Sequence, residues 1–215
     1  MIDIYKMTMK YYSFLFFLLT LFSYAYAQTP TTIPGYYVTN TNDTVNAQIK
    51  MPHYIFSNKA MLIKFAEKVT IVDSVKGNMV FKVNDIKGFG FLYNDNRYQF
   101  LSKDFGRENA FSASTHRFYQ AIILGQKSNL YHRLTTVDPS GRILGITYFL
   151  EKSNGTNTAI YLFARIQPEF IRNLLKQFYK DNVVVHTLID SKFQNKSFET
   201  WQNDIIEIVQ AVNKL

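Results

Sequence analysis

The stretch NLYHRLTTVDPSGRILGITYFLE, residues 129–151, decides the fold. It contains two apolar and β-branched segments, Asn129 to Val137 and Ile143 to Glu151, separated by Asp138-Pro139-Ser140-Gly141-Arg142. Aspartate, proline, serine and glycine favour turns, because proline fixes φ, glycine permits positive φ and the short polar side chains bond their own backbone. The stretch therefore predicts two antiparallel strands joined by a turn and not a helix.

The same pattern continues on both sides of this pair. Phe118 to Leu124 precedes it and Ala159 to Ile166 follows it. Turn-forming segments, Gly125 to Ser128 and Ser153 to Thr156, mark the intervals between these runs. Residues 118–166 are therefore predicted to form an antiparallel meander.

The N-terminal half shows alternating strands. Val45, Ala47, Ile49 and Met51 alternate with polar residues, which places the apolar set on one face of a sheet. A hairpin is predicted with the preceding Gly-Tyr-Tyr-Val. Further strands are predicted at Met61–Phe65, Val69–Asp73, Met79–Val83, Phe89–Tyr93 and Tyr98–Leu101, with a turn at Asn94-Asp95-Asn96.

The apolar period changes at Pro168, a residue type favoured at the first helical position. Apolar side chains then recur at helical spacing up to Phe178, and a second helix is predicted after Asp181 and a third from Phe198 to Val212. The predicted class is α+β: an antiparallel β-rich N-terminal and central region, a meander that is curved or barrel-like, followed by about three short C-terminal helices.

Composition excludes several classes of protein. The 215 residues are 47% hydrophobic and include no cysteine, with 24 Lys plus Arg against 16 Asp plus Glu. A chain of this apolarity can bury a core, and without thiols it has no disulfide framework, cysteine nucleophile or thiolate metal site. The basic surplus is spread along the chain without a Lys/Arg run, so nucleic acid is not expected as a partner.

The N-terminus has the features of a secretory signal peptide. Residues 11–24 are uncharged and mostly apolar, two lysines precede them, and Ala25 and Ala27 supply the small residues that signal peptidase needs. We expect cleavage before Gln28, which removes residues 1–27 as the signal peptide. The apolar run is shorter than the roughly 20 residues of a membrane span.

The predicted organisation of the mature chain has two parts, an antiparallel β region at 28–166 and a helical C-terminal region at 167–215 packed on it. No cysteine stands at the cleavage point to carry a lipid. No later segment approaches a transmembrane length of continuous apolar residues, so the mature protein is expected not to be an integral membrane protein, and to be periplasmic, envelope-associated or secreted.

Motifs for catalysis are absent from the sequence. Gly88-Phe89-Gly90 has Tyr93 where a dinucleotide loop would have its third glycine, which excludes such a loop. The two glycines of this motif instead predict a bulge or a close backbone approach. The four histidines show no metal-ligand spacing, and no nucleophile elbow occurs. The sequence predicts no catalytic residue, no metal and no cofactor.

Candidate binding residues come from clusters in which an aromatic residue adjoins a cation. Arg97 and Tyr98 form one pair, and His132 and Arg133 follow Tyr131 in another. Aromatic rings beside cations can stack on sugars or hold anions. Alternate strand residues face opposite sides, however, so the other interpretation is a core aromatic beside a solvated neighbour.

Three short motifs carry a resemblance. They are Gly35-Tyr36-Tyr37-Val38-Thr39-Asn40 with Asn42–Val45 after it, Ile86–Phe91, and Tyr148–Lys152. Together they resemble uncharacterised exported proteins common in Bacteroidota. That resemblance implies β-strands followed by short helices and a Gram-negative envelope location, and it supplies no activity.

The leading functional hypothesis is an exported, non-catalytic binding or structural module of the envelope, whose partner is an envelope component or another protein. The alternative is a hydrolase acting on envelope or extracellular polymers, which would need convergent carboxylates or histidines in a cleft. An outer-membrane barrel ranks third, because amphipathic helices and not an aromatic strand end the chain.

Overall fold

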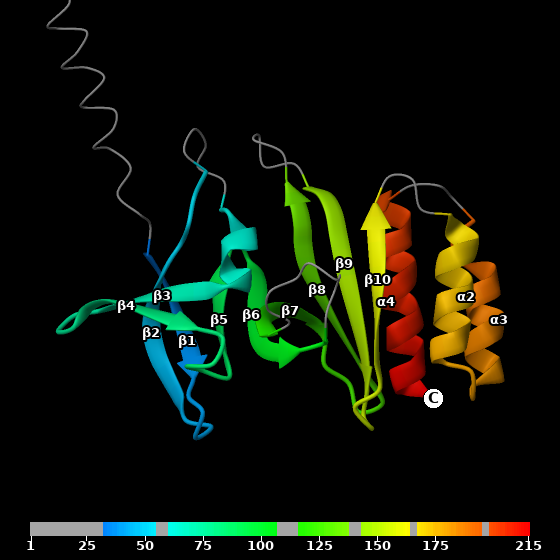
Figure 1. Ribbon diagram of the computed structural model, residues 1–215, viewed down its shortest axis with the longest axis horizontal. Coiled ribbons are helices and arrows are strands. Elements are labelled where there is room, and N and C mark those ends of the chain that lie inside the picture. The colour runs from blue at the N-terminus through cyan, green and yellow to red at the C-terminus, as the bar shows by residue number, and fades with distance from the viewer. Residues whose placement is uncertain (1–31, 55–59, 107–115, 138–142, 164–166, 195–197) are drawn as a thin grey trace, which may run out of the picture. The chain divides into compact units, whose positions relative to one another are not determined.

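One antiparallel sheet of ten strands organises the chain (Figure 1). The computed structural model describes residues 32–54, 60–106, 116–137, 143–163, 167–194 and 198–215. The predicted cleavage residues Ala25, Ala27 and Gln28 lie outside the described residues, as does the turn at 138–142. The strand order is β10-β9-β8-β7-β6-β5-β1-β2-β3-β4, so β10 and β4 are the two edges and the sheet does not close on itself.

The strands and helices follow in chain order. The strands of the N-terminal part are β1 (Thr32–Val38), β2 (Thr44–Lys50), β3 (Lys68–Asp73), β4 (Gly77–Lys82) and β5 (Gly88–Tyr93). The rest of the sheet comprises β6 (Asn96–Asp104), β7 (His116–Ile123), β8 (Ser128–Val137), β9 (Ile143–Lys152) and β10 (Asn157–Phe163). The helices are a 3-10 helix η1 (Leu62–Ala66) and the α-helices α2 (Pro168–Phe178), α3 (Val183–Ser191) and α4 (Phe198–Lys214).

Strand β1 occupies a special place in this order. Strands β5 to β10 pair with their neighbours in the sequence, and so do β1 to β4, but β1 also pairs with β5. Gly35 to Val38 of β1 lie opposite Gly88 to Phe91 of β5. The chain therefore runs out to β4 at the edge and returns to place β5 on the other side of β1.

The C-terminal helices cover one face of the strands β7 to β10. Helix α4 lies against β7 and β8, α2 against β10, and α3 against both helices (Figure 1). Buried side chains of the helices and of the sheet form one cluster. The sheet contributes Leu130, Ile146, Tyr148, Leu150, Ile160 and Leu162, and the helices contribute Ile171, Leu175, Val185, Ile189, Trp201 and Ile205. Burial of each such aliphatic side chain stabilises the fold by about 1.5–3 kcal/mol relative to exposure.

A second core, rich in phenylalanine, lies in the N-terminal half of the sheet. The ring of Phe65, in η1, is centred 5.3 Å from Phe89, 5.3 Å from Phe91 and 5.4 Å from Phe100. The strand predicted at Met61–Phe65 is therefore wrong. This apolar run forms a short helix instead, since one helical turn places Phe65 and Ala66 in the core and leaves Lys64 exposed.

The predicted fold class is confirmed, and so are most of its elements. The β5–β6 turn has positive φ at Asn94 (49°) and Asp95 (60°), as its composition predicts. The close backbone approach predicted for the glycine pair is also confirmed, because a Cβ on Gly88 would lie 2.4 Å from the carbonyl oxygen of Phe100. Three helices end the chain at the predicted places.

Candidate binding groove

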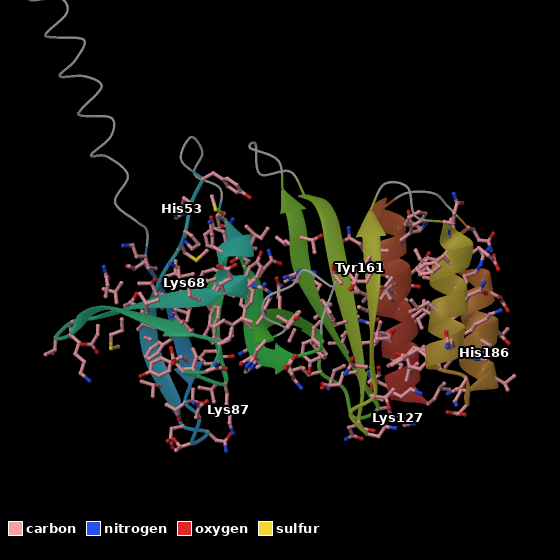
Figure 2. The ribbon with its side chains drawn as sticks, viewed as in Figure 1. His53, Lys68, Lys87, Lys127, Tyr161 and His186 are labelled. Atoms are coloured by element: carbon pink, nitrogen blue, oxygen red, sulfur yellow. The ribbon has the colours of Figure 1, made fainter. Side chains whose placement is uncertain are left out.

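One hollow in the described part of the chain lies where β2 and β3 separate. Their pairing comprises only Gln48 with Val72 and Ile49 with Ile71. Beyond these pairs β3 turns into the hairpin with β4, and Figure 1 shows β3 and β4 crossing in front of β1 and β2. Lys68, labelled in Figure 2, is the first residue of β3. A groove of about 550 Å³ remains between the diverging strands, within the size range of sites that hold small ligands.

The floor of the groove is apolar. Gly35 and Tyr37 of β1 pair with Ala47 and Val45 of β2, so all four residues share one face of the sheet. Ile71 of β3 and Met79 of β4 pair with each other and add two apolar side chains to the lining, on the same face because Ile71 pairs with Ile49 of β2. Val45 remains 36% exposed, which leaves apolar surface open to an incoming molecule.

The groove lies along a strand edge. Four consecutive residues of β2, Val45 to Gln48, line it, and so do the consecutive residues Ile71 to Ser74. Successive side chains of a strand point to opposite faces, so a space over one face would contact only alternate residues. Since Gly35 and Tyr37 of β1 also line it, the space lies over the face that they share with Val45 and Ala47 and extends to the adjoining edge of β2, where backbone N–H and C=O groups are presented.

Asp73 is the only ionisable carboxylate among the residues that line the groove. Its Oδ1 accepts the backbone N–H groups of Val75 at 2.8 Å and Lys76 at 2.7 Å. The backbone bond from Lys76 and then that from Val75 hold the pKa of Asp73 below its ordinary value. Asp73 is therefore a fixed negative charge at one end of an otherwise neutral groove.

A separate polar network centres on Glu151 of β9. Its two carboxylate oxygens each accept a bond from Lys103 Nζ at 2.9 Å, and Oε2 also accepts bonds from Asn129 at 3.2 Å and Tyr131 at 3.0 Å. Burial opposes the charge, but these bonds outweigh it and hold the pKa of Glu151 below its ordinary value. With three donors on Oε2 and one on Oε1, the carboxylate joins β6, β8 and β9.

The sequence-predicted pair Arg97 and Tyr98 divides between two faces of β6. Tyr98 is half-buried and stacks on Phe91 with ring centroids 5.3 Å apart, and burial first and Tyr93 second raise its pKa. Arg97 is exposed and lies opposite Leu92, which is 62% exposed. Tyr98 thus belongs to the phenylalanine-rich core and Arg97 to the solvated side.

His132 lies on the helix-covered face of β8. Its Nε2 is 2.9 Å from Gln120 Oε1, and its ring centroid is 5.8 Å from that of Tyr148. Burial lowers the pKa of His132 to about 4, so the ring is neutral near pH 7. His132 lines a cavity of about 10 Å³, roughly the space of one water molecule, and its buried Nδ1 has no partner among the described residues.

Arg133 follows His132, pairs with Thr147 of β9 and lines the same small cavity as His132. β7 separates both residues from β6 in the sheet, so the four predicted binding residues are not brought into one site. The groove residues were not predicted as a site. Alternation identified Val45 and Ala47 as one face, but no sequence signal shows that β2 and β3 diverge after two pairs.

Nowhere in the described part of the chain do three His, Asp or Glu side chains gather as ligands of a metal ion would. Within the same residues, none of the helices combines the length and the apolarity needed to cross a bilayer. Comparison of the chain with protein-family models, with curated proteins and with solved structures returned no match.

Proposed function

We propose that this protein is an exported, non-catalytic binding module of the cell envelope and that the groove between β2 and β3 holds its ligand. The observation that carries the proposal is the groove itself: about 550 Å³, an apolar floor and a single carboxylate at the end. Binding sites in proteins have this character, a mostly apolar concavity with a few placed polar groups.

The groove favours binding over hydrolysis. Glycoside hydrolysis by paired carboxylates needs two such groups on either side of one bond, and Asp73 is the one carboxylate in the lining. Envelope location is the part of the proposal supported by the N-terminal sequence, with its apolar run and Ala25-Tyr26-Ala27.

Ligand binding can be tested by titrating the ¹⁵N-labelled mature protein with three soluble probes: a mixture of acetylated hexapeptides, tetra-N-acetylchitotetraose and decanoate. We expect at least one probe to shift the amide signals of residues 45–48 and 71–74. Val45→Lys should abolish these shifts, whereas Val80→Lys, a matched change at an exposed position outside the groove lining, should not. If no probe shifts these signals, the proposed groove function is overturned.

Export is tested separately by sequencing the N-terminus of the protein recovered from its native cells. The expected first residue is Gln28. A chain that retains residues 1–27 in the cytoplasm would overturn the envelope location.

A further inference from the structure

We propose that the ligand of the groove is an extended peptide segment that adds as a strand to the open edge of β2 and places a basic side chain beside Asp73. The inference rests on the proposed binding function and specifies the chemical class of its ligand.

The backbone of β2 supplies the first reason. β1 pairs with all seven residues of β2, from Thr44 to Lys50, along one edge. Along the other edge β3 pairs only with Gln48 and Ile49. Among the strands that the structure describes, Thr44 to Ala47 therefore pair with β1 on one side and with no strand on the other. An unmatched strand edge presents regularly spaced N–H and C=O groups, and the molecule that matches this spacing is another extended main chain.

The side chains along that edge supply the second reason. Side chains of an added strand would alternate between the apolar face of Tyr37, Val45 and Ala47 and the polar side chains of Asn46 and Gln48. The unmatched segment is four residues long, which corresponds to about 13 Å of strand. The groove therefore fits a short segment of alternating apolar and polar residues.

Charge supplies the third reason. Asp73 is held ionised by two backbone bonds, both to Oδ1, at the end of the groove where the β3–β4 hairpin begins. No lysine or arginine is among the residues lining the groove. A segment with one lysine or arginine near its end complements this charge, although Lys76 in the same turn weakens the local potential.

The test uses a defined library of acetylated, amidated hexapeptides with alternating valine and threonine and with lysine placed at each position in turn. Binding to the mature protein is measured by calorimetry and by ¹⁵N spectra. We expect binding that shifts the amides of residues 44–47 and depends on the lysine position. Failure of every peptide to bind, while decanoate or the chito-oligosaccharide binds the groove, would overturn the peptide inference and leave the proposed function standing.

Strand addition is distinguished from side-chain binding by N-methylation of each amide of the tightest peptide in turn. Amides of an edge strand alternate in direction, so methylation should weaken binding roughly tenfold or more at every second residue and have little effect between them. Uniform effects along the peptide would overturn strand addition.

The role of Asp73 is tested with Asp73→Asn, which keeps an oxygen for the Val75 and Lys76 N–H groups. The matched control is Asp85→Asn, since Asp85 also accepts a backbone bond, from Lys82 at 2.7 Å, and is outside the groove lining. Asp73→Asn should weaken the lysine peptides by about two- to fivefold and a lysine-free peptide by little, and Asp85→Asn should change neither. Equal effects of both variants would overturn the assigned contact.

A second copy of this chain is the remaining occupant to be distinguished. The peptide inference is overturned if sedimentation shows a dimer that Val45→Lys dissociates, that Val80→Lys leaves intact and that no peptide disrupts. The groove would then be a self-association surface. A monomer that binds the peptides supports the peptide inference.

Discussion

Asn213 in the last turn of α4 is hydrogen-bonded to the main chain of Ser128 in both directions. Its Oδ1 accepts the Ser128 N–H at 3.0 Å, and its Nδ2 donates to the Ser128 carbonyl at 2.8 Å. Oδ1 also accepts the N–H of Lys127 at 3.0 Å, at the turn labelled in Figure 2. One side chain thus fixes the end of the last helix to the turn between β7 and β8.

Asn213→Ala should lower the free energy of unfolding by about 1–3 kcal/mol, because it removes the partners of three backbone groups near a buried residue. Urea denaturation followed by circular dichroism measures this. Gln210→Ala, an exposed change on the same helix, should cost less than about 0.5 kcal/mol. Equal costs for the two variants would show that the contact contributes nothing.

Gly125→Ala should be destabilising through the same side chain. A Cβ at Gly125 would lie 2.2 Å from the Asn213 amide, closer than any real contact. Because the obstacle is one side chain, the cost of Gly125→Ala should fall in the Asn213→Ala background. A double-mutant cycle in urea measures this coupling, and additive costs would contradict the packing described.

Stability should decrease as the pH falls from about 6.5 towards 4, because of His132. Its folded pKa of about 4 is below the unfolded value of 6.5, so the unfolded chain binds more protons in this range. Stabilisation by the neutral ring is complete above the unfolded pKa, and roughly 2 kcal/mol should be lost between pH 7 and pH 5.

His132→Leu tests the source of that pH dependence. The variant loses the bond to Gln120 and should be less stable than the parent at pH 7, yet its stability should change less between pH 7 and 5. Thermal unfolding at half-unit intervals of pH provides the measurement. A parallel pH profile for parent and variant would refute the assignment.

Glu151→Gln should lower the free energy of unfolding by about 1–3 kcal/mol. The reason is that Lys103 would lose its counter-ion, and the Glu151 side chain is only 17% exposed. Glu207→Gln is the matched control, because Glu207 pairs with Lys192 but its side chain is 54% exposed. That change should cost below about 1 kcal/mol.

The charge of Glu151 also has a pH signature. Its folded pKa is below the ordinary 4.5, so its stabilisation is present above that value and is lost as the pH falls through the folded pKa. In Glu151→Gln this acid-side loss should be smaller than in the parent protein. Unfolding measured below pH 4.5 that shows the same loss in both would contradict the role of the carboxylate.

The sequence was most informative where a local pattern has one physical solution. Positive φ at Asn94 and Asp95 follows from residue types that tolerate it, and the helix after Pro168 follows from apolar spacing. The strand prediction for Met61–Phe65 failed because a short apolar segment suits a strand or a helical turn equally. The packing of Phe65 against Phe89 and its neighbours selects the helix.

Polar side chains that act at long range were beyond sequence reasoning. Asp204 of α4 is 8% exposed, and its Oδ2 accepts the N–H of Phe193, a residue outside that helix, at 2.8 Å. Asp73 was predicted only as the end of a strand. Its place in the groove depends on where two strands diverge, and that divergence is a property of the whole sheet and not of a local segment.

The position of β1 between β5 and β2 has a consequence for the order of folding. The meander from β5 to β10 joins strands that follow one another directly, so each of its pairings closes a connection of at most 11 residues. The contact of Gly35 with Phe91 spans 56 residues and requires β2, β3 and β4 to turn back first. Because such distant pairings are slow, we expect β1 to be the last strand to gain both neighbours, and one of its edges stays exposed on the folding chain until that step is complete.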